Sequence, residues 1–123
     1  MEKVNGIGGV FFAAKDPQAL ADWYSGVLGV DQPPASYDTP PWQQTAGPTV
    51  FAPMDATASF FTAPGAGWSI NFRVTDLDAM VAQLRQQGVR VDIDPEVYPN
   101  GRFASLRDPE GNPIQLWQVA GIG

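Results

Sequence analysis

The stretch WSINFRVTDLDA, residues 68–79, combines a strand with the start of a helix. Its first seven residues alternate in polarity: the apolar members are Trp68, Ile70, Phe72 and Val74, and the polar members are Ser69, Asn71 and Arg73. Successive side chains of a strand point to opposite faces of a sheet, so the three polar side chains point the same way. The pattern predicts a sheet with one apolar face and one polar face.

A helix is expected directly after this strand. Asp76 or Thr75 is suited to cap its N-terminus, and Gly88 is suited to end it. Between them, apolar residues recur at helical spacing: Leu77, Met80, Val81 and Leu84. The spacing predicts an amphipathic helix that packs its apolar stripe against the sheet.

The same arrangement occurs earlier in the chain. A strand is predicted over residues 7–14, followed by a helix that Asp16 caps and Gly29 ends. The apolar stripe of this helix consists of Leu20, Trp23, Tyr24, Val27 and Leu28. A shift of the chain by sixty residues aligns Phe12 with Phe72, Asp16 with Asp76, Ala19 with Ala79 and Val10 with Ile70. The chain therefore contains an internal repeat.

Further strands are predicted after each helix. In the second half, residues 89–93 precede a hairpin formed by residues 101–107 and 113–119 around the turn DPEGN. The first half has counterparts at residues 41–46 and 49–54. These elements predict one α+β domain, residues 1–123, made of two βαβββ modules. The boundaries are about 5–54 for the first module, 55–67 for the connection and about 68–120 for the second.

Composition excludes several classes of function. With 13 acidic and 7 basic residues, the formal net charge of −6 opposes binding to nucleic acid or to anionic membrane surfaces. The chain contains neither cysteine nor histidine, so thiolate chemistry and histidine general bases are absent. The apolar runs are far shorter than the ~20 residues that span a bilayer, and we expect a cytoplasmic protein.

Three features together resemble the vicinal oxygen chelate superfamily, which includes glyoxalase I, extradiol dioxygenases and bleomycin resistance proteins. They are the paired modules, the segment TDLDA (75–79) after a strand, and the closing segment RDPEGNPIQLW (107–117). The resemblance covers nearly the whole chain, and the D-P-x-G-N turn is its most specific element. It implies a glyoxalase-like fold, in which two modules form a curved mixed β-sheet cup with helices on the outside and ligands inside.

Enzymes of this superfamily hold a divalent metal in the cup, usually through histidine on the first strand and glutamate on the last strand of a module. The matched positions in this sequence are Gly9, Ser69, Gln115 and Phe51. Glycine and phenylalanine side chains cannot bind a metal, and serine and neutral glutamine are poor ligands. We therefore expect no metal and no other cofactor.

The resemblance implies that the polar side chains of residues 68–74 point into the cup. The side chains expected to bind a ligand there are Phe11, Phe51, Ser69, Asn71, Arg73, Gln115 and Trp117. This set combines apolar surface with a few polar groups, as small-molecule sites do. Arg73 can bind an anionic group or stack on a planar ring. The alternatives for Arg73 are an ion pair with Asp94 or Glu96, or exposure to solvent.

The leading interpretation is a metal-free small-molecule-binding protein of the glyoxalase/bleomycin resistance type. Its ligand is expected to be partly aromatic, with an anionic group as an option, and sequestration is the expected role. One alternative is a lyase, isomerase or dioxygenase of the superfamily with an atypical active site. Another is an interaction module whose cup is filled by its own side chains. The resemblance also implies a homodimer, because two-module members commonly pair or exchange modules.

Overall fold

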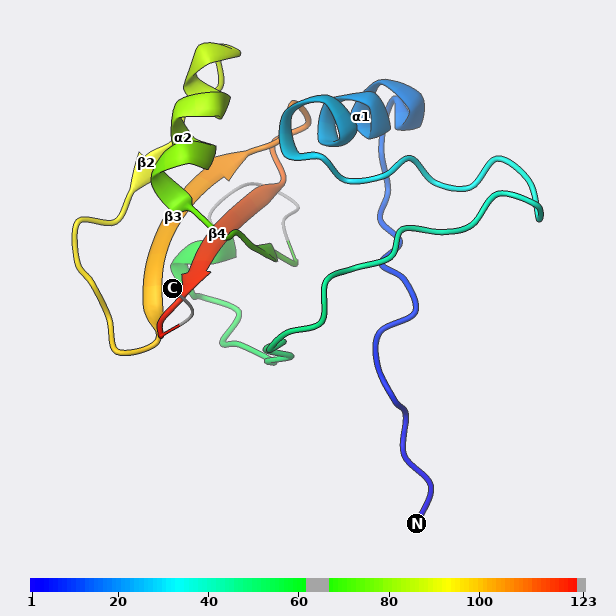
Figure 1. The fold of residues 1–123 in the computed structure, drawn as a ribbon, viewed down its shortest axis with the longest axis horizontal. Helices are drawn as coiled ribbons and strands as arrows, with labels where there is room; N and C mark the ends of the chain where they lie inside the picture. The colour runs from blue at the N-terminus through cyan, green and yellow to red at the C-terminus, as the bar shows by residue number, and fades with distance from the viewer. Residues whose placement is uncertain (62–66, 122–123) are drawn as a thin grey trace.

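The computed structural model describes residues 1–61 and 67–121. Two helices and a four-stranded sheet form the folded part of the chain (Figure 1). In chain order the elements are α1 (Pro17–Trp23), the π-helical turn η1 (Tyr24–Leu28), the 3-10 turn η2 (Ser59–Phe61), β1 (Ile70–Arg73), α2 (Leu77–Gln86), β2 (Asp92–Ile93), β3 (Gly101–Arg107) and β4 (Pro113–Val119). The connection predicted over residues 55–67 is described only as far as residue 61 and at residue 67.

The sheet has the strand order β1-β4-β3-β2. Strand β1 pairs with β4 in parallel. The pairs β4–β3 and β3–β2 are antiparallel. This mixed sheet confirms the α+β class, and the order β1-α2-β2-β3-β4 is one complete βαβββ module. The predicted hairpin around residues 108–112 is present. Strand β2 is shorter than the predicted segment 89–93, since it contains two residues.

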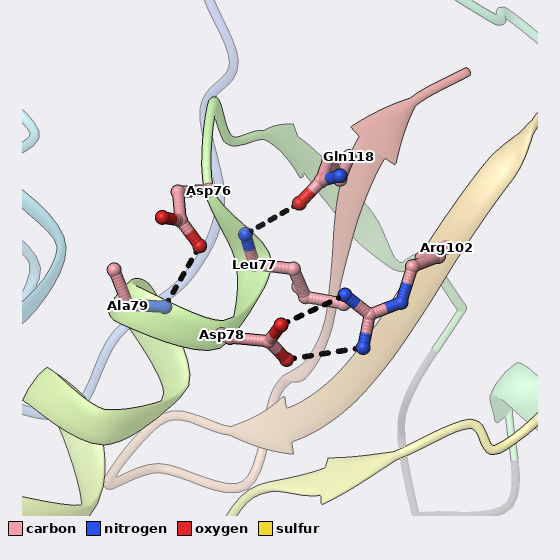
Figure 2. A network of polar contacts seen from close by, with 6 residues as sticks. All are labelled: Asp76, Leu77, Asp78, Ala79, Arg102 and Gln118. Atoms are coloured by element: carbon pink, nitrogen blue, oxygen red, sulfur yellow. Dashed lines mark hydrogen bonds and ion pairs between the residues drawn. The ribbon is translucent and has the colours of Figure 1, made fainter. Parts of the chain in front are cut away.

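Both helices begin at the predicted caps. The Asp76 carboxylate accepts a hydrogen bond from Ala79 N at 3.0 Å, so Asp76 is the cap of α2 (Figure 2). The Asp16 carboxylate does the same for Ala19 N at 3.1 Å. These bonds satisfy backbone donors that have no partner within a helix. The first helix ends at Gly29, whose φ of 75° is the left-handed conformation that glycine adopts without strain.

Two polar contacts fix the start of α2 on the sheet (Figure 2). Leu77 N donates to Gln118 Oε1 on β4 at 2.8 Å. Arg102 on β3 donates through both Nη atoms to the Asp78 carboxylate at 3.0 and 3.1 Å. A paired guanidinium and carboxylate constrain orientation as well as distance. Helix α2 is therefore held at a defined angle on the sheet.

The core lies between the helices and one face of the sheet. Its buried members are Leu20, Tyr24, Val27, Leu77, Val81, Leu84, Val91, Ala104, Leu106, Ile114 and Leu116. Ile70, Phe72 and Val74 pack against this cluster. The prediction that the apolar parity of residues 68–74 meets the helices is therefore confirmed. It follows that the alternate side chains, those of Ser69, Asn71 and Arg73, lie on the other face of the sheet.

The DPEGN turn joins β3 to β4 and is hydrogen-bonded to the first helix. Asp108 is buried, at 5% exposure. Its carboxylate accepts hydrogen bonds from Tyr24 Oη, Glu110 N, Asn112 N and Asn112 Nδ2, at 2.6 to 3.0 Å. Burial, together with the bond to Asp108, raises the pKa of the Tyr24 hydroxyl well above its ordinary value. The turn is thus both a chain reversal and a polar anchor within the core.

The first module differs from the sequence prediction. Residues 7–14, 41–46 and 49–54 were expected to form strands, but none of them belongs to a strand. They run as an open trace without strand pairing (Figure 1), and touch the folded part at single points such as Thr45 O, which accepts from Arg73. A strand needs a neighbour for its backbone hydrogen bonds, and these segments have none. Helix α1, in contrast, packs on the core of the second module. In the single chain, the first module therefore has its helix in place and its strands unpaired.

Candidate functional site

A row of polar side chains crosses the sheet face that lies away from the helices. The strand register places Asn71 beside Gln115, and Gln115 beside Ser105. Asn71 Nδ2 donates to Gln115 Oε1 at 2.8 Å. Ser69, which comes just before β1, donates from Oγ to Pro113 O at 3.3 Å. Four of the predicted site residues, including Arg73, therefore lie on or beside this face, which we call the polar face.

A second row of the polar face contains aromatic rings. The register places Arg73 beside Trp117, and Trp117 beside Phe103. The rings of Phe103 and Trp117 are nearly parallel, at 8°, with centroids 6.2 Å apart. Trp117 is only 8% exposed, and its Nε1 donates to Asn100 O at 2.8 Å. The indole is thus fixed in orientation, and the half-buried Phe103 ring is the more accessible of the pair.

The polar face contains two adjoining hollows. One has a volume of about 270 Å³ and is lined by Asp92, Ile93, Asp94, Phe103, Ala104, Ser105 and Gln115. The other, of about 420 Å³, shares Asp92, Ser105 and Gln115 and extends to Ser59 and Ser69. The turn η2, which carries Ser59, lies on the side of the sheet opposite α2 (Figure 1). The larger volume is within the range of about 300–1,000 Å³ that is usual for small-molecule sites, and the smaller is just below it.

Arg73 is held at the end of the polar face by a segment of the first module. Its Nη2 donates to Thr45 O at 2.9 Å. A Cβ at Gly47 would collide with the Arg73 guanidinium, so glycine lets the two lie close together. Within residues 1–61 and 67–121, Arg73 forms no ion pair. The alternative of an ion pair with Asp94 or Glu96 is therefore not observed in this part of the chain.

The outer edge of the hollow is acidic at neutral pH. Asp94 accepts hydrogen bonds from Glu96 N at 3.0 Å and from Tyr98 Oη at 2.8 Å. Both bonds favour the carboxylate, so they hold the pKa of Asp94 below its ordinary value. The same bond to Asp94 is the main cause that raises the pKa of Tyr98 to about 12. Tyr98 therefore remains a protonated donor while Asp94 is charged.

Two predicted site residues lie elsewhere in the single chain. Phe11 is 96% exposed and Phe51 is 84% exposed, and neither lines the two hollows of the polar face. Conversely, Phe103 and Ser105 line the hollow and were not among the predicted ligand contacts. Phe103 pairs with Trp117 and Ser105 with Gln115, so the hairpin register places all four side chains on the same face of the sheet. That register was the signal that could have found them.

The donor atoms of this face do not fit a divalent metal. Ser69 donates its hydroxyl to a backbone carbonyl, and Gln115 Oε1 accepts from Asn71, so both are engaged within the protein. Gly9 and Phe51 have no side-chain atom that can bind a metal. Among the described residues, no group of three His, Cys, Asp or Glu side chains is placed to hold a metal ion. The chemistry available here is hydrogen bonding, ring contact, the carboxylates of Asp92 and Asp94, and the guanidinium groups of Arg73 and Arg107.

Comparison with known proteins places this geometry in a family. The sequence model of the glyoxalase-like domain matches residues 9–117. The chain belongs to the glyoxalase-like family. This family is part of the vicinal oxygen chelate superfamily, so the resemblance inferred from the sequence is confirmed. A search of curated proteins finds no match.

Solved structures agree with membership of the glyoxalase-like family. A glyoxalase/bleomycin resistance protein from Streptomyces sp. CB03234 is 30% identical, with a TM-score of 0.51 over 85% of this chain and 92% of that one. TnmS3, an antibiotic binding protein from the same organism, is 26% identical, with a TM-score of 0.54 over 86% and 88%. A protein from Bacillus anthracis assigned to the glyoxalase family is 17% identical, with a TM-score of 0.55 over 95% and 99%, and shows likeness of fold alone. In the described part of the chain, no helix is long and apolar enough to cross a membrane.

Proposed function

We propose that this protein binds a small, partly aromatic molecule on the polar face and sequesters it in the cytoplasm without using a metal. The observation that carries the proposal is the hollow lined by Gln115, Ser105 and Phe103, with Asn71 and Trp117 beside it in register. Such a hollow offers apolar contact area together with a few fixed polar groups, which is the usual composition of a small-molecule site. A homodimer is part of the same proposal.

The amide row can recognise polar groups of the ligand. In the described residues, the bond from Asn71 Nδ2 to Gln115 Oε1 is the one side-chain hydrogen bond that either amide makes. Gln115 Nε2 is therefore available as a donor and Asn71 Oδ1 as an acceptor. Because the two side chains fix one another, little rotamer entropy is lost when they bind a ligand. This arrangement suits a ligand that carries both a donor and an acceptor beside its ring.

The aromatic row can bind the ring itself. Phe103 lines the hollow, and Trp117 supports it from the adjacent strand. Aromatic pairs contribute about 0.5–1.5 kcal/mol beyond the area that they bury. Arg73 lies beside Trp117 in register, and of its N–H groups Nη2 alone has an acceptor among the described residues. An anionic substituent next to the ring would therefore meet the remaining guanidinium donors.

The comparisons support a binding role. TnmS3 is described as an antibiotic binding protein, and this chain covers 88% of its length. The second Streptomyces relative is described as a glyoxalase/bleomycin resistance protein. Sequestration requires affinity without turnover. The polar face supplies groups for affinity, and its donor atoms do not fit the metal that the superfamily's enzymes use.

Substitution of Arg73 is expected to change the preference for charged ligands. The probe is 1-anilinonaphthalene-8-sulfonate, which is aromatic and anionic, and N-phenyl-1-naphthylamine is its neutral counterpart. We expect Arg73→Ala to weaken binding of the sulfonate roughly tenfold, because a hydrogen bond to a charged group contributes about 1.5 kcal/mol. Binding of the neutral probe should change less than twofold. Fluorescence titration measures both affinities.

The matched control is Lys15→Ala, which removes one exposed cation outside the polar face and lowers the net charge equally. It should leave both affinities unchanged. Equal weakening of the two probes by Arg73→Ala would show a general structural effect. Equal effects of Lys15→Ala and Arg73→Ala on the sulfonate would show that net charge alone decides. Either result would contradict a local role for Arg73.

A further inference from the structure

A four-residue turn lies beside the aromatic rings of the polar face. We call residues 98–101, with the sequence Tyr-Pro-Asn-Gly, the YPNG turn. Its end residues exchange both backbone hydrogen bonds: Tyr98 N donates to Gly101 O, and Gly101 N donates to Tyr98 O, each at 3.0 Å. Pro99 has the fixed φ that suits the second position of a tight turn. The turn therefore closes through its own backbone, without a ligand.

The turn holds the indole of Trp117 through one backbone oxygen. Asn100 O accepts from Trp117 Nε1 at 2.8 Å and from Ala120 N at 3.1 Å. Because Ala120 directly follows β4, the second bond fixes the turn to the strand that carries Trp117. Trp117 is buried and lines neither hollow. Its indole is therefore placed to support a neighbouring ring.

Glycine is required at position 101 for this close approach. The φ of Gly101 is 138°, a conformation in which other residues are strained. A Cβ there would lie 2.8 Å from Trp117 Nε1 and would collide with Gln118 O. A side chain at this position would therefore push the turn away from β4. Gly101 thus lets Asn100 O come within hydrogen-bonding distance of the indole.

The first residue of the turn packs on Phe103. The Tyr98 ring meets the Phe103 ring edge-on, with centroids 5.8 Å apart and planes at 68°. The Tyr98 hydroxyl donates to Asp94 Oδ2 at 2.8 Å, so this ring is fixed as well. Phe103 is therefore in contact with two rings, and the YPNG turn fixes both. Of these three rings, that of Phe103 lines a hollow.

The opposite face of the same strands is constrained too (Figure 2). Arg102 and Gln118 are partners in the register of β3 and β4, and both hold the start of α2 through the contacts described above. Arg102 directly precedes Phe103, and Gln118 directly follows Trp117. The backbone that carries the two rings is thus fixed from the helical side. The YPNG turn therefore acts on rings whose strands are already held.

We propose that the YPNG turn positions the Phe103 ring for the ligand, with Asn100 and Gly101 as positioning residues outside the hollow. This inference rests on the proposed function, because it assumes that the ring of the ligand packs on Phe103. A side chain that is held in place before binding loses little rotamer freedom when the ligand arrives, and the entropy saved strengthens binding. The turn thus contributes to affinity without contact with the ligand.

Substitution of Gly101 tests the inference, and Gly88→Ala is the matched control. Both glycines have a positive φ, of 138° and 80°, but a Cβ at Gly88 would meet nothing within 4 Å. Backbone strain should destabilise both variants, whereas Gly101→Ala alone should displace the turn. We expect Gly101→Ala to weaken binding of N-phenyl-1-naphthylamine roughly three- to tenfold, the factor for one more side chain immobilised on binding. Gly88→Ala should change it less than twofold in the same fluorescence titration.

The indole N–H gives a readout that backbone strain alone would not move. In ¹⁵N-labelled protein without ligand, the Trp117 Nε1 proton should exchange slowly with water in the wild type and in Gly88→Ala. In Gly101→Ala it should exchange faster by roughly tenfold or more, because the bond to Asn100 O is lost. Trp117→Phe identifies the signal by its absence. Equal exchange and equal probe affinity in the two glycine variants would overturn the inference.

Trp117→Phe is a second variant, which serves if Gly101→Ala does not fold. It keeps an aromatic ring on β4 and removes the donor to Asn100 O. We expect it to weaken binding of the neutral probe roughly three- to tenfold. Tyr98→Phe removes only the bond to Asp94 and should weaken binding roughly two- to threefold. Wild-type affinity in both variants would overturn the inference.

This inference and the proposed function fail in different ways. If the probe shifts the side-chain amide signals of Asn71 and Gln115 equally in wild type, Gly101→Ala and Trp117→Phe, and with the same affinity, the site exists and the turn does not position it. That result refutes this inference alone. If the wild-type protein binds no probe although its indole N–H is protected, the turn fixes the ring but the polar face is not a binding site. That result refutes the proposed function, and positioning for a ligand with it.

Discussion

Substitution of Asp108 by alanine should destabilise the protein by about 3–5 kcal/mol, because it removes the one acceptor of a buried polar cluster. Four donors converge on this carboxylate: Tyr24 Oη, Glu110 N, Asn112 N and Asn112 Nδ2. Each buried donor left without an acceptor costs about 1–3 kcal/mol, and partial access of water reduces the sum. Urea unfolding monitored by circular dichroism measures the loss.

The carboxylate should matter more than any one of its donors. Tyr24→Phe removes only the hydroxyl, and we expect it to cost about 1–2 kcal/mol. Asp38→Ala is the control, since Asp38 is exposed in the loop that follows the first helix. It should change the free energy of unfolding by less than about 0.5 kcal/mol. If Asp108→Ala proves as mild as Asp38→Ala, the turn does not anchor the first helix.

Substitution of Leu116 by alanine should cost about 3–5 kcal/mol. Leu116 has no exposed surface, and its neighbours in the sheet are Phe72 on β1 and Ala104 on β3. It lies in the layer where Leu77 and Leu84 of α2 meet the sheet. Truncation removes apolar contacts and leaves a cavity that rigid neighbouring strands cannot fill. The same unfolding assay measures the change.

The comparison for Leu116 is an aliphatic residue on the surface. Val97 is 70% exposed in the loop between β2 and β3, so Val97→Ala should change the free energy of unfolding by less than about 0.5 kcal/mol. The polar face should also respond to Leu116→Ala, because Gln115 and Trp117 are its sequence neighbours on β4. A loss below about 1 kcal/mol for Leu116→Ala would mean that the layer between α2 and the sheet is loosely packed, contrary to this structure.

The second module was predictable from sequence because its signals are local. Alternation in residues 68–74 identified the two faces of β1, and the capping pattern at Asp76 identified the start of α2. The DPEGN turn identified the hairpin. Strand β2 was predicted too long because residues 89–93 alternate in polarity throughout, whereas only Asp92 and Ile93 pair with β3. The unpaired strands of the first module could not be predicted, since periodicity indicates a strand but not which neighbour it pairs with.

The same distinction explains the site. Ser69, Asn71, Arg73, Gln115 and Trp117 were predicted from parity together with the family resemblance. The register between β1 and β4 places Asn71 beside Gln115 and Arg73 beside Trp117, and Ser69 comes just before β1. Phe103 and Ser105 were missed because their relation to Gln115 depends on the hairpin register. Phe11 and Phe51 lie in segments that were predicted as strands and are unpaired in this structure, and periodicity along the chain does not indicate where an unpaired segment lies.

The central claim is that the polar face binds the ligand. Its most direct test is a titration of the ¹⁵N-labelled protein with 1-anilinonaphthalene-8-sulfonate, observed through the side-chain amides. Signals of Asn71 and Gln115 should shift and saturate together, whereas that of Gln83, which is bonded to Val27 O on the helical side of the sheet, should not move. Shifts that reach Gln83 and leave Asn71 and Gln115 unchanged would contradict the claim.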